Sequence, residues 1–420
     1  MTKRLLLLST TTGYQAQEFR AAAERIGIPL ALASDSCHAL DDPWRDGAIS
    51  VRFQKPRESA GKIREFAQHH PIHGVAAIGD VPTRTAALVA QELALPFHPP
   101  SAVEACRNKF LARERYKKAG MRVPWYTKFK AASDAAAAAR AVPYPCVLKP
   151  LGLSASRGVI RANDRQEFAA AFARIRALLQ EREIKIMRDE AAAWIQVESY
   201  IPGREIALEG LVTGGRLRAL AIFDKPDPLE GPFFEETIYV TPSRLSAAEQ
   251  QAILDCAQQA VTALGLSHGP VHAELRLNTE GAWMLDIAAR PIGGLCAGAL
   301  RFQHDSVTIS LEELVLRHAL GDEVENIPRE PAAAAVMMIP IPQAGLYEGV
   351  ENLEAAEQVP GIERVEITAK LQQKLVPLPE GASYLGFIFA RGGTPAFVES
   401  ALRDSHRKLR FFISPEIPLL

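Results

Sequence analysis

Two short segments in the second half of the sequence predict a β-hairpin that carries acidic side chains. H-A-E-L-R occupies residues 272–276 and W-M-L-D-I-A-A-R-P-I-G-G occupies residues 283–294, with a turn-rich N-T-E-G at 278–281 between them. Turn residues between two strand-like segments fold a chain back on itself. Glu274 and Asp286 would then lie beside each other on one rigid ribbon.

These two carboxylates have the chemistry of a divalent-metal site. Mg²⁺ prefers oxygen ligands and keeps waters and phosphate oxygens in its remaining positions, so one or two carboxylates suffice. Arg290 follows Asp286 closely enough to reach a transferring phosphoryl group or the acyl oxygen beside it. Taken alone, an amphipathic hairpin with solvent-facing charges is the commoner explanation of such a pattern, so the rest of the chain has to decide.

Length and composition indicate a globular protein of several domains. A chain of 420 residues corresponds to about two to three domains of ordinary size. Its 48% hydrophobic and 23% charged residues are typical of a globular protein. The balance of 48 basic against 49 acidic residues gives no electrostatic reason to expect nucleic acid or a membrane surface as a partner.

The cysteines and the N-terminus indicate a cytoplasmic protein. The five cysteines are odd in number and form no C-x-x-C pair, which argues against a disulfide framework and a zinc ribbon. We expect reduced, mostly buried thiols at Cys37, Cys106, Cys146, Cys256 and Cys296. Lys3-Arg4 precedes only four leucines, too short an apolar run for a signal peptide or a membrane span.

The first hundred residues predict a small doubly wound α/β domain. Continuous apolar runs predict buried strands, and helical patterns separate some of them; the strands are expected at 4–9, 29–33, 48–52 and 73–78, and the helices at 15–26 and 58–69. Such sheets bind ligands at the carboxyl ends of their strands, which makes the Thr10–Tyr14 loop and Gly79-Asp80 candidate ligand-facing positions. Ordinary turn chemistry explains the same residues equally well, and no G-x-G-x-x-G follows the first strand.

The next segment contains a candidate phosphate-binding loop. One helix is expected from Ser101 to Gly120, with Lys109 either facing a phosphate or lying on a solvated basic face. A strand at 146–149 ends in Lys149, and L-G-L-S-A-S-R-G-V follows at 151–159. Small residues let backbone N–H groups wrap around a polyphosphate. A flexible hairpin loop without a ligand explains the pattern as well, and the Walker A signature is absent.

Strands dominate the part of the chain that follows. The strand at 193–199 leads into Y-I-P-G, strands at 206–213 and 216–223 are joined by Gly214-Gly215, and the Pro- and Gly-rich loop 224–237 carries Lys225, Glu235 and Glu236. The S-A-A-E capping box opens a helix at 246–264. Further helices are expected at 306–320 and 394–408, the latter within a C-terminal region of short strands.

In their order along the chain these features resemble the ATP-grasp superfamily. The resemblance depends on Lys109, Lys149, the loop from Ser154 to Gly158, the V-E-S-Y-I-P-G-R-E run at 197–205, Glu274 and Asp286. D-K-P-D-P-L-E-G-P-F-F-E-E-T, H-A-E-L-R and D-I-A-A-R-P-I-G-G are most similar to the L-amino acid ligases, which form dipeptides. Ala288 replaces the metal-binding asparagine of many superfamily members, as in that subgroup.

The resemblance implies a role for each residue that matches a motif. ATP phosphates would be bound by Lys109, Lys149, Ser154, Ser156, Arg157 and Gly158, and the nucleoside by Glu198, Tyr200, Ile201 and Glu205, with Glu205 on the ribose. Glu274 and Asp286 would hold Mg²⁺ or Mn²⁺, with two ions expected. Arg290 would hold the acyl phosphate, and the substrate site would include His272, Glu236, Gly293 and Gly294. A buried structural role for His272 is equally compatible with the sequence.

The implied fold combines α/β and α+β domains. It consists of an N-terminal doubly wound α/β domain (1–100), the first ATP-grasp lobe with the phosphate loop (101–190), the second lobe with the metal site (191–325) and a small C-terminal α+β domain (326–420). The implied reaction joins a carboxylate to an amine through an acyl phosphate, releasing ADP and phosphate. We expect amino acids or similar small molecules as substrates, and a homodimer because two-fold dimers are the commonest assemblies.

Two other functions are compatible with these motifs. The first is ATP-grasp chemistry with another nucleophile, of the purine-pathway or biotin carboxylase type. The second is a nucleotide-binding regulatory protein without turnover, against which the presence of Lys149, Glu274, Asp286 and Arg290 weighs. The sequence does not specify which acid or amine would enter the site.

Overall fold

An eight-stranded antiparallel sheet forms the centre of the molecule in the computed structural model, which describes residues 3–10, 15–35 and 47–415. Its strand order is β13-β12-β9-β10-β11-β16-β20-β18. The strands are β9 (Arg204–Thr213), β10 (Arg216–Asp224), β11 (Ile238–Thr241), β12 (His268–Asn278), β13 (Gly281–Ala288), β16 (Ala333–Ile339), β18 (Ile362–Ile367) and β20 (Gly386–Gly392). The C-terminal strands β16, β18 and β20 therefore continue the sheet that carries the predicted hairpin, across the proposed division at 325/326.

A parallel four-stranded sheet, of order β3-β2-β1-β4, forms the N-terminal part, as predicted. Its strands are β1 (Leu5–Ser9), β2 (Leu30–Ser34), β3 (Ala48–Ser50) and β4 (Gly74–Ile78). Both faces are covered, which explains the uninterrupted run of leucines. Leu5 and Leu7 pack with α1 (Ala16–Arg25) and α10 (Leu311–Ala319), and Leu6 and Leu8 pack with α2 (Pro56–His69) and α3 (Asp80–Glu92). Of the predicted ligand-facing loop, Thr11–Tyr14 lies outside the described residues.

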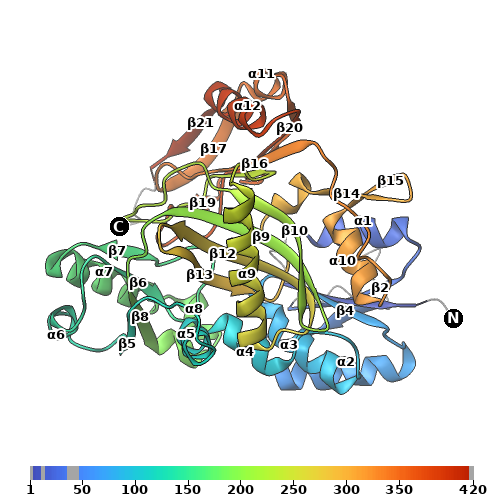
Figure 1. Ribbon diagram of the computed structural model, residues 1–420, viewed down its shortest axis with the longest axis horizontal. Helices are drawn as coiled ribbons and strands as arrows, with labels where there is room; N and C mark the ends of the chain where they lie inside the picture. Colours follow the sequence, from blue (N-terminus) through green and yellow to red (C-terminus); the bar gives the residue numbers. More distant parts are fainter. Residues whose placement is uncertain (1–2, 11–14, 36–46, 416–420) are drawn as a thin grey trace.

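A second four-stranded sheet, antiparallel and of order β5-β8-β6-β7, lies at the lower left of Figure 1. It contains β5 (Tyr126–Lys130), β6 (Cys146–Pro150), β7 (Ile160–Ala162) and β8 (Trp194–Ser199), and it is accompanied by α6 (Ala135–Arg140), α7 (Arg165–Leu178) and α8 (Arg182–Ile186). β8 pairs with both β5 and β6, although the predicted division at 190/191 would separate it from them. We therefore propose that the two ATP-grasp lobes divide after Ser199.

The single helix predicted from Ser101 to Gly120 is wrong. The structure contains α4 (Pro100–Arg107) and α5 (Lys109–Lys118), which are separated by Asn108 in an extended conformation. The Asn108 side chain accepts a hydrogen bond of 3.0 Å from the N–H of Leu111, so it caps α5. The break places Lys109 in the first turn of a new helix.

The helix predicted from residue 306 is also too long. Residues 301–310 form a hairpin of β14 (Arg301–His304) and β15 (Val307–Ser310), and α10 begins only after it. Asp305 and Ser306 have positive φ angles of 46° and 70°, which a helix does not allow. The Ser310 hydroxyl then caps α10 by accepting from the N–H of Glu313.

Other predicted elements are confirmed. Thr213 pairs with Arg216 across the Gly214-Gly215 turn, and Ser246 forms the expected capping box at the start of α9 (Ala247–Leu264). α9 packs against the central sheet together with α4 and α5. The C-terminal region adds β17 (Gly345–Glu351), β19 (Lys374–Leu375), β21 (Arg410–Ser414), α11 (Leu353–Glu357) and α12 (Pro395–Lys408), and its two helices lie at the top of Figure 1.

The described residues also bear on the cysteines and on membrane spans. Cys106, Cys146, Cys256 and Cys296 are free thiols, three of them buried and Cys256 half-buried, as expected; Cys37 lies outside the described part. Within the described part of the chain, no helix has both the length and the apolar character to cross a membrane.

Three buried or half-buried histidines meet where the N-terminal region joins β12 and α10. The rings of His268 and His318 stack with their centroids 4.0 Å apart. His98 Nδ1 accepts a hydrogen bond of 3.2 Å from the N–H of Ser267. Burial lowers the pKa of His98 to about 4 and that of His318 to about 3, so both rings are neutral at neutral pH.

This cluster predicts a loss of stability in mild acid. An unfolded histidine binds a proton near its ordinary pKa of 6.5, whereas folded His98 binds one only near pH 4. The free energy of unfolding should therefore fall as the pH is lowered from 6.5 towards 4, as denaturation at a series of pH values would measure. His98→Asn should reduce the slope and the exposed control His69→Asn should not; equal slopes in all three proteins would contradict this account.

The cap of α5 gives a second stability prediction. Asn108→Ala should lower the free energy of unfolding by about 1 kcal/mol, because the N–H of Leu111 loses its acceptor. Chemical denaturation measures this change. The matched control is Gln251→Ala, at an exposed position inside α9. If Asn108→Ala and the control had the same free energy of unfolding, the cap would not contribute to stability.

Candidate functional site

The predicted hairpin is present, and it brings its two acidic residues together. In the antiparallel pair β12 and β13, Glu274 lies directly opposite Asp286, and Asn278 lies opposite Gly281 at the turn. A β-bulge interrupts the register next to this pair, between Glu274 and Leu275. Both carboxylates line the same cavity.

This cavity has an empty volume of about 1160 Å³, part of which is open to solvent. It lies between the hairpin, the strand-ending lysine, the phosphate loop and the N-terminal end of α3. Thirteen of the seventeen predicted site residues line it: Lys109, Lys149, Ser154, Ser156, Glu198, Tyr200, Ile201, Glu205, Glu236, His272, Glu274, Asp286 and Arg290. Arg157, Gly158, Gly293 and Gly294 do not.

Lys109 connects the phosphate loop to the hairpin. Its Nζ donates a hydrogen bond of 2.6 Å to the carbonyl oxygen of Leu153 and lies 3.7 Å from Oδ2 of Asp286. The helix break at Asn108 makes this possible, because it places Lys109 at the start of α5 beside the cavity. A cation here is suited to an anionic ligand between the loop and the hairpin.

Lys149 shares a buried carboxylate with Arg113. Oε2 of Glu198 lies 2.6 Å from Lys149 Nζ, and Oε1 lies 2.6 Å from Arg113 Nε. Although burial opposes ionisation, the charges of Arg113 and Lys149 hold the pKa of Glu198 well below its ordinary range. Gln196 also donates to Glu198. Glu198 thus fixes the lysine, while its predicted contact with the nucleoside stays a prediction.

The sequence predicted no role for Arg113, which lies on the helix whose solvated basic face was an alternative explanation for Lys109. The Arg113 side chain is 3% exposed, and it also donates to the carbonyl oxygen of Leu285 in β13. The burial of Arg113 could not be recognised from the basic character of the helix, because Lys117 and Lys118 on the same helix are exposed. The clue was the spacing, since Arg113 lies one helical turn from Lys109, on the same side of α5.

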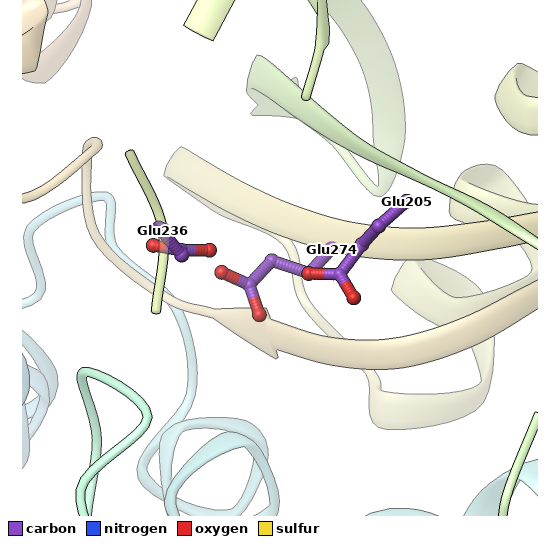
Figure 2. A group of neighbouring side chains, drawn as sticks. All are labelled: Glu205, Glu236 and Glu274. Carbon is purple, nitrogen blue, oxygen red and sulfur yellow. The ribbon is translucent and has the colours of Figure 1, made fainter. Parts of the chain in front are cut away.

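Three carboxylates that line the cavity surround a buried lysine. Oxygen atoms of Glu205, Glu236 and Glu274 lie within 4.8 Å of one another, and Figure 2 shows the Glu274 carboxylate between the other two. Lys225 Nζ, on a side chain that is 2% exposed, contacts all three, at 2.9 Å from Glu205 and 3.4 Å from Glu274. Lys225 and Glu236 of the loop 224–237 therefore belong to an internal ion cluster rather than to a solvated surface.

Charge repulsion distinguishes the members of this cluster. Burial and the neighbouring charge of Glu274 raise the pKa of Glu236 to about 8. Despite its burial, Lys225 has a pKa well above the ordinary value, because carboxylates surround it. The lysine ammonium therefore already supplies positive charge to the three-carboxylate group.

Glu205 has both of its oxygen atoms engaged by protein cations. Oε1 accepts from Lys225, and Oε2 accepts from Nε of Arg276 at 3.0 Å. Arg276 also donates to the carbonyl oxygen of Ile201 at 2.7 Å. Sequence reasoning missed Arg276, which fixes the segment predicted to bind the nucleoside; the ribose contact of Glu205 stays a prediction.

His272 is held by a buried carboxylate that the sequence reasoning also missed. Its Nδ1 lies 3.0 Å from Oε2 of Glu209, which is fully buried on the neighbouring strand β9. Oε1 of Glu209 accepts from the N–H of Ile292. Burial raises the pKa of Glu209. The arrangement fixes the histidine ring at the cavity wall.

Arg290 forms a two-point ion pair with Asp80 of the N-terminal region. Its Nε and Nη2 lie 3.0 and 2.9 Å from the two carboxylate oxygens. Burial opposes ionisation of Asp80, but Arg290 and Arg107 lower its pKa to about 2. Gly293 lies near the Arg290 guanidinium, and Gly294, with a φ of 61°, packs on the Phe387 ring.

Part of the phosphate loop lines the cavity and part of it points away from the cavity. Ser154, Ala155 and Ser156 face the cavity, and the last two have positive φ angles of 55°. Arg157 instead turns to Glu181, at 2.6 Å, and to Glu183, at 2.5 Å. Gly158 is explained by packing, because a Cβ there would lie 2.6 Å from Pro150. Arg157 and Gly158 do not line the cavity, and their predicted phosphate contacts stay predictions.

Family models match two parts of the chain. Residues 142–299 match the ATP-grasp domain, and residues 337–414 match the L-amino acid ligase C-terminal domain 2. The chain belongs to the ATP-grasp ligases. The crystal structure of L-amino acid ligase from Bacillus licheniformis has a TM-score of 0.81 at 26% sequence identity, over 98% of this chain and 99% of that one.

One further relative and one further solved structure are similar to this ATP-grasp ligase. Alanine–anticapsin ligase of Bacillus subtilis is 28% identical over 207 residues, which is 46% of this chain and 43% of that ligase. Phosphoribosylglycinamide synthetase from Anaerococcus prevotii has a TM-score of 0.68 at 14% identity, with 99% of this chain and 100% of that chain covered. At that identity the second similarity shows the fold alone.

The buried Glu198 cluster predicts a strongly destabilised variant. Arg113→Met should lower the free energy of unfolding by roughly 3 kcal/mol or more, because Glu198 keeps only part of its compensating charge. Denaturant titration measures the loss, and exposed Lys117→Met is the control on the same helix. Adding Glu198→Gln should recover part of the stability of Arg113→Met. No recovery would mean that lost packing, rather than uncompensated charge, causes the effect.

Proposed function

We propose that this ATP-grasp ligase joins the carboxylate of one amino acid to the amine of another, using ATP and forming an acyl phosphate. The observation that carries the proposal is the convergence in one cavity of two lysines, the opposed carboxylates Glu274 and Asp286, and Arg290. The similarity to an L-amino acid ligase over nearly the whole chain supports amino acids as the substrate class.

The donor set fits a hard divalent cation. Glu274 and Asp286 present oxygen ligands from two paired strands, and we expect them to hold Mg²⁺ or Mn²⁺, as two ions. When bound, such ions neutralise phosphate charge. Ala288, which lines the cavity at the position of the usual asparagine, contributes no ligand. The three-carboxylate group around Lys225 is less suited to a second metal, because an ammonium already lies within it.

In the first step, a carboxylate oxygen of the acid attacks the γ-phosphorus of ATP. The bond from that phosphorus to the bridging oxygen breaks, and ADP leaves. Such a transfer needs alignment and positive charge rather than covalent catalysis by the protein. Lys109 and Lys149, which both line the cavity, would supply positive charge to the phosphates.

In the second step, the amine nitrogen attacks the acyl carbon and phosphate leaves. We propose that Arg290 stabilises the negative charge of the acyl phosphate and of its tetrahedral successor, while His272, fixed by Glu209, orients the acid. A thiol intermediate is disfavoured, since burial strongly raises the pKa of Cys106, which also lines the cavity.

The proposal is tested by measuring ADP release from ATP with pairwise mixtures of amino acids, and by detecting products by mass. ADP release should require both an acid and an amine, and a dipeptide should appear. Release that depends on bicarbonate instead would support the alternative nucleophile of the carboxylase type, and the absence of any amine dependence would refute the dipeptide ligase.

A variant pair tests the hairpin. Glu274→Gln should reduce amine-dependent ADP release by about two orders of magnitude or more, because a neutral amide is a weaker ligand than a carboxylate for the divalent cation that we propose neutralises the phosphates. Glu280→Gln, at the exposed turn of the same hairpin, should keep the activity of the unmodified enzyme. Unchanged turnover in Glu274→Gln would exclude a role for this carboxylate in the reaction.

A further inference from the structure

Asp80 reaches the cavity from outside the part of the chain that matches the ATP-grasp domain. It is the first residue of α3, directly after the end of β4, and Gly79 makes the sharp turn between them with a φ of 77°. The carboxyl ends of parallel strands are where such sheets place functional groups. Asp80 lines the cavity beside Arg290.

We propose that Asp80 is a positioning residue for the reaction: it holds the Arg290 guanidinium in the orientation that receives the acyl phosphate. The inference rests on the function proposed above and adds a residue of the N-terminal region to its machinery.

The geometry of the pair supports a positioning role. Two parallel hydrogen bonds, from Nε and Nη2, fix the plane of the guanidinium, and Nη1 donates to the carbonyl oxygen of Pro291 at 2.9 Å. An arginine has five N–H donors, and among the described residues these contacts use three of them. The remaining donors are available to an anion in the cavity.

Asp80 is itself fixed by other walls of the cavity. The Arg107 guanidinium donates to the backbone carbonyl oxygen of Asp80 and also pairs with Asp189 at 3.5 Å. Ser154, in the phosphate loop, lines the cavity together with Asp80 and helps to lower the pKa of the Asp80 carboxyl. Asp80 therefore connects Arg290 and Arg107 to the end of β4 in the N-terminal sheet.

Burial makes this pair sensitive to substitution. The side chains of Arg290 and Asp80 are 13% and 25% exposed, whereas the ion pair of Arg84 and Glu104, which also involves α3, is 36% and 38% exposed. A guanidinium without its partner can adopt several rotamers, and small displacements of a group near the reacting atoms cost about 100-fold in rate.

The test is Asp80→Asn, which keeps the side-chain size but removes the charge and one acceptor oxygen. We expect kcat for amine-dependent ADP release to fall about 100-fold, with a much smaller change in KM for ATP. Asp80→Glu, which restores the carboxylate, should recover part of kcat. Glu104→Gln, which breaks the more exposed pair, is the matched control and should keep the kcat of the unmodified enzyme.

A double-mutant cycle separates positioning from simple stabilisation. If Asp80 acts through Arg290, adding Asp80→Asn to Arg290→Ala should cause little further loss of kcat. The same 100-fold loss in that background would overturn the proposal, as would a variant whose only change is a lower thermal unfolding midpoint.

A crystal structure of Asp80→Asn gives an outcome that does not depend on turnover. Arg290 should leave the position that it has here. An unmoved Arg290 would overturn the positioning role even if the enzyme proved to be a dipeptide ligase. Conversely, the unmodified enzyme could show no amine-dependent ADP release while Arg290 is displaced in the variant. That result would refute the proposed function but would still show that the position of Arg290 depends on Asp80.

Discussion

The ammonium of Lys225, almost inaccessible to solvent, lies among the carboxylates of Glu205, Glu236 and Glu274. Elsewhere in the cavity, the carboxylates of Glu198 and Asp80 are likewise paired with cations that are largely buried. A buried charge is costly unless a partner compensates it. Glu205 lies in β9, Glu274 lies in β12, and Lys225 and Glu236 lie in the loop between β10 and β11, so compensation of charge connects two strands and a loop.

The central sheet determines which of these charges meet. Its antiparallel register places Glu274 opposite both Asp286 and Ala207, and His272 opposite Glu209. The C-terminal strands extend this same sheet, and the segment between β19 and β20 contacts the phosphate loop directly. The N–H of Gly158 donates to the carbonyl oxygen of Pro379 at 2.7 Å, and Arg157 donates to that of Glu380 at 2.6 Å. The C-terminal region thus supports the loop mechanically as well as extending the sheet.

Local patterns predicted most of the elements correctly where the cause was local. The leucine run of β1, the capping box of Ser246 and the Gly214-Gly215 turn depend on neighbouring residues, and all three are present. The errors occurred where one or two residues adopt a backbone conformation that interrupts a helix. Asn108 ended one helix and capped the next, and Asp305-Ser306 turned an expected helix into a hairpin.

The sequence by itself determined the hairpin with its two carboxylates, the order of the motifs and hence the ATP-grasp resemblance, because these depend on short-range turn chemistry and on residue identity. Only the tertiary structure decided which buried charges are partners: Arg113 with Glu198, Glu209 with His272, and Asp80 with Arg290. Those partners are 63 to 210 residues apart in the chain. Neither spacing nor composition encodes such pairs, because they form only when sheets and helices pack and exclude water from the charges between them.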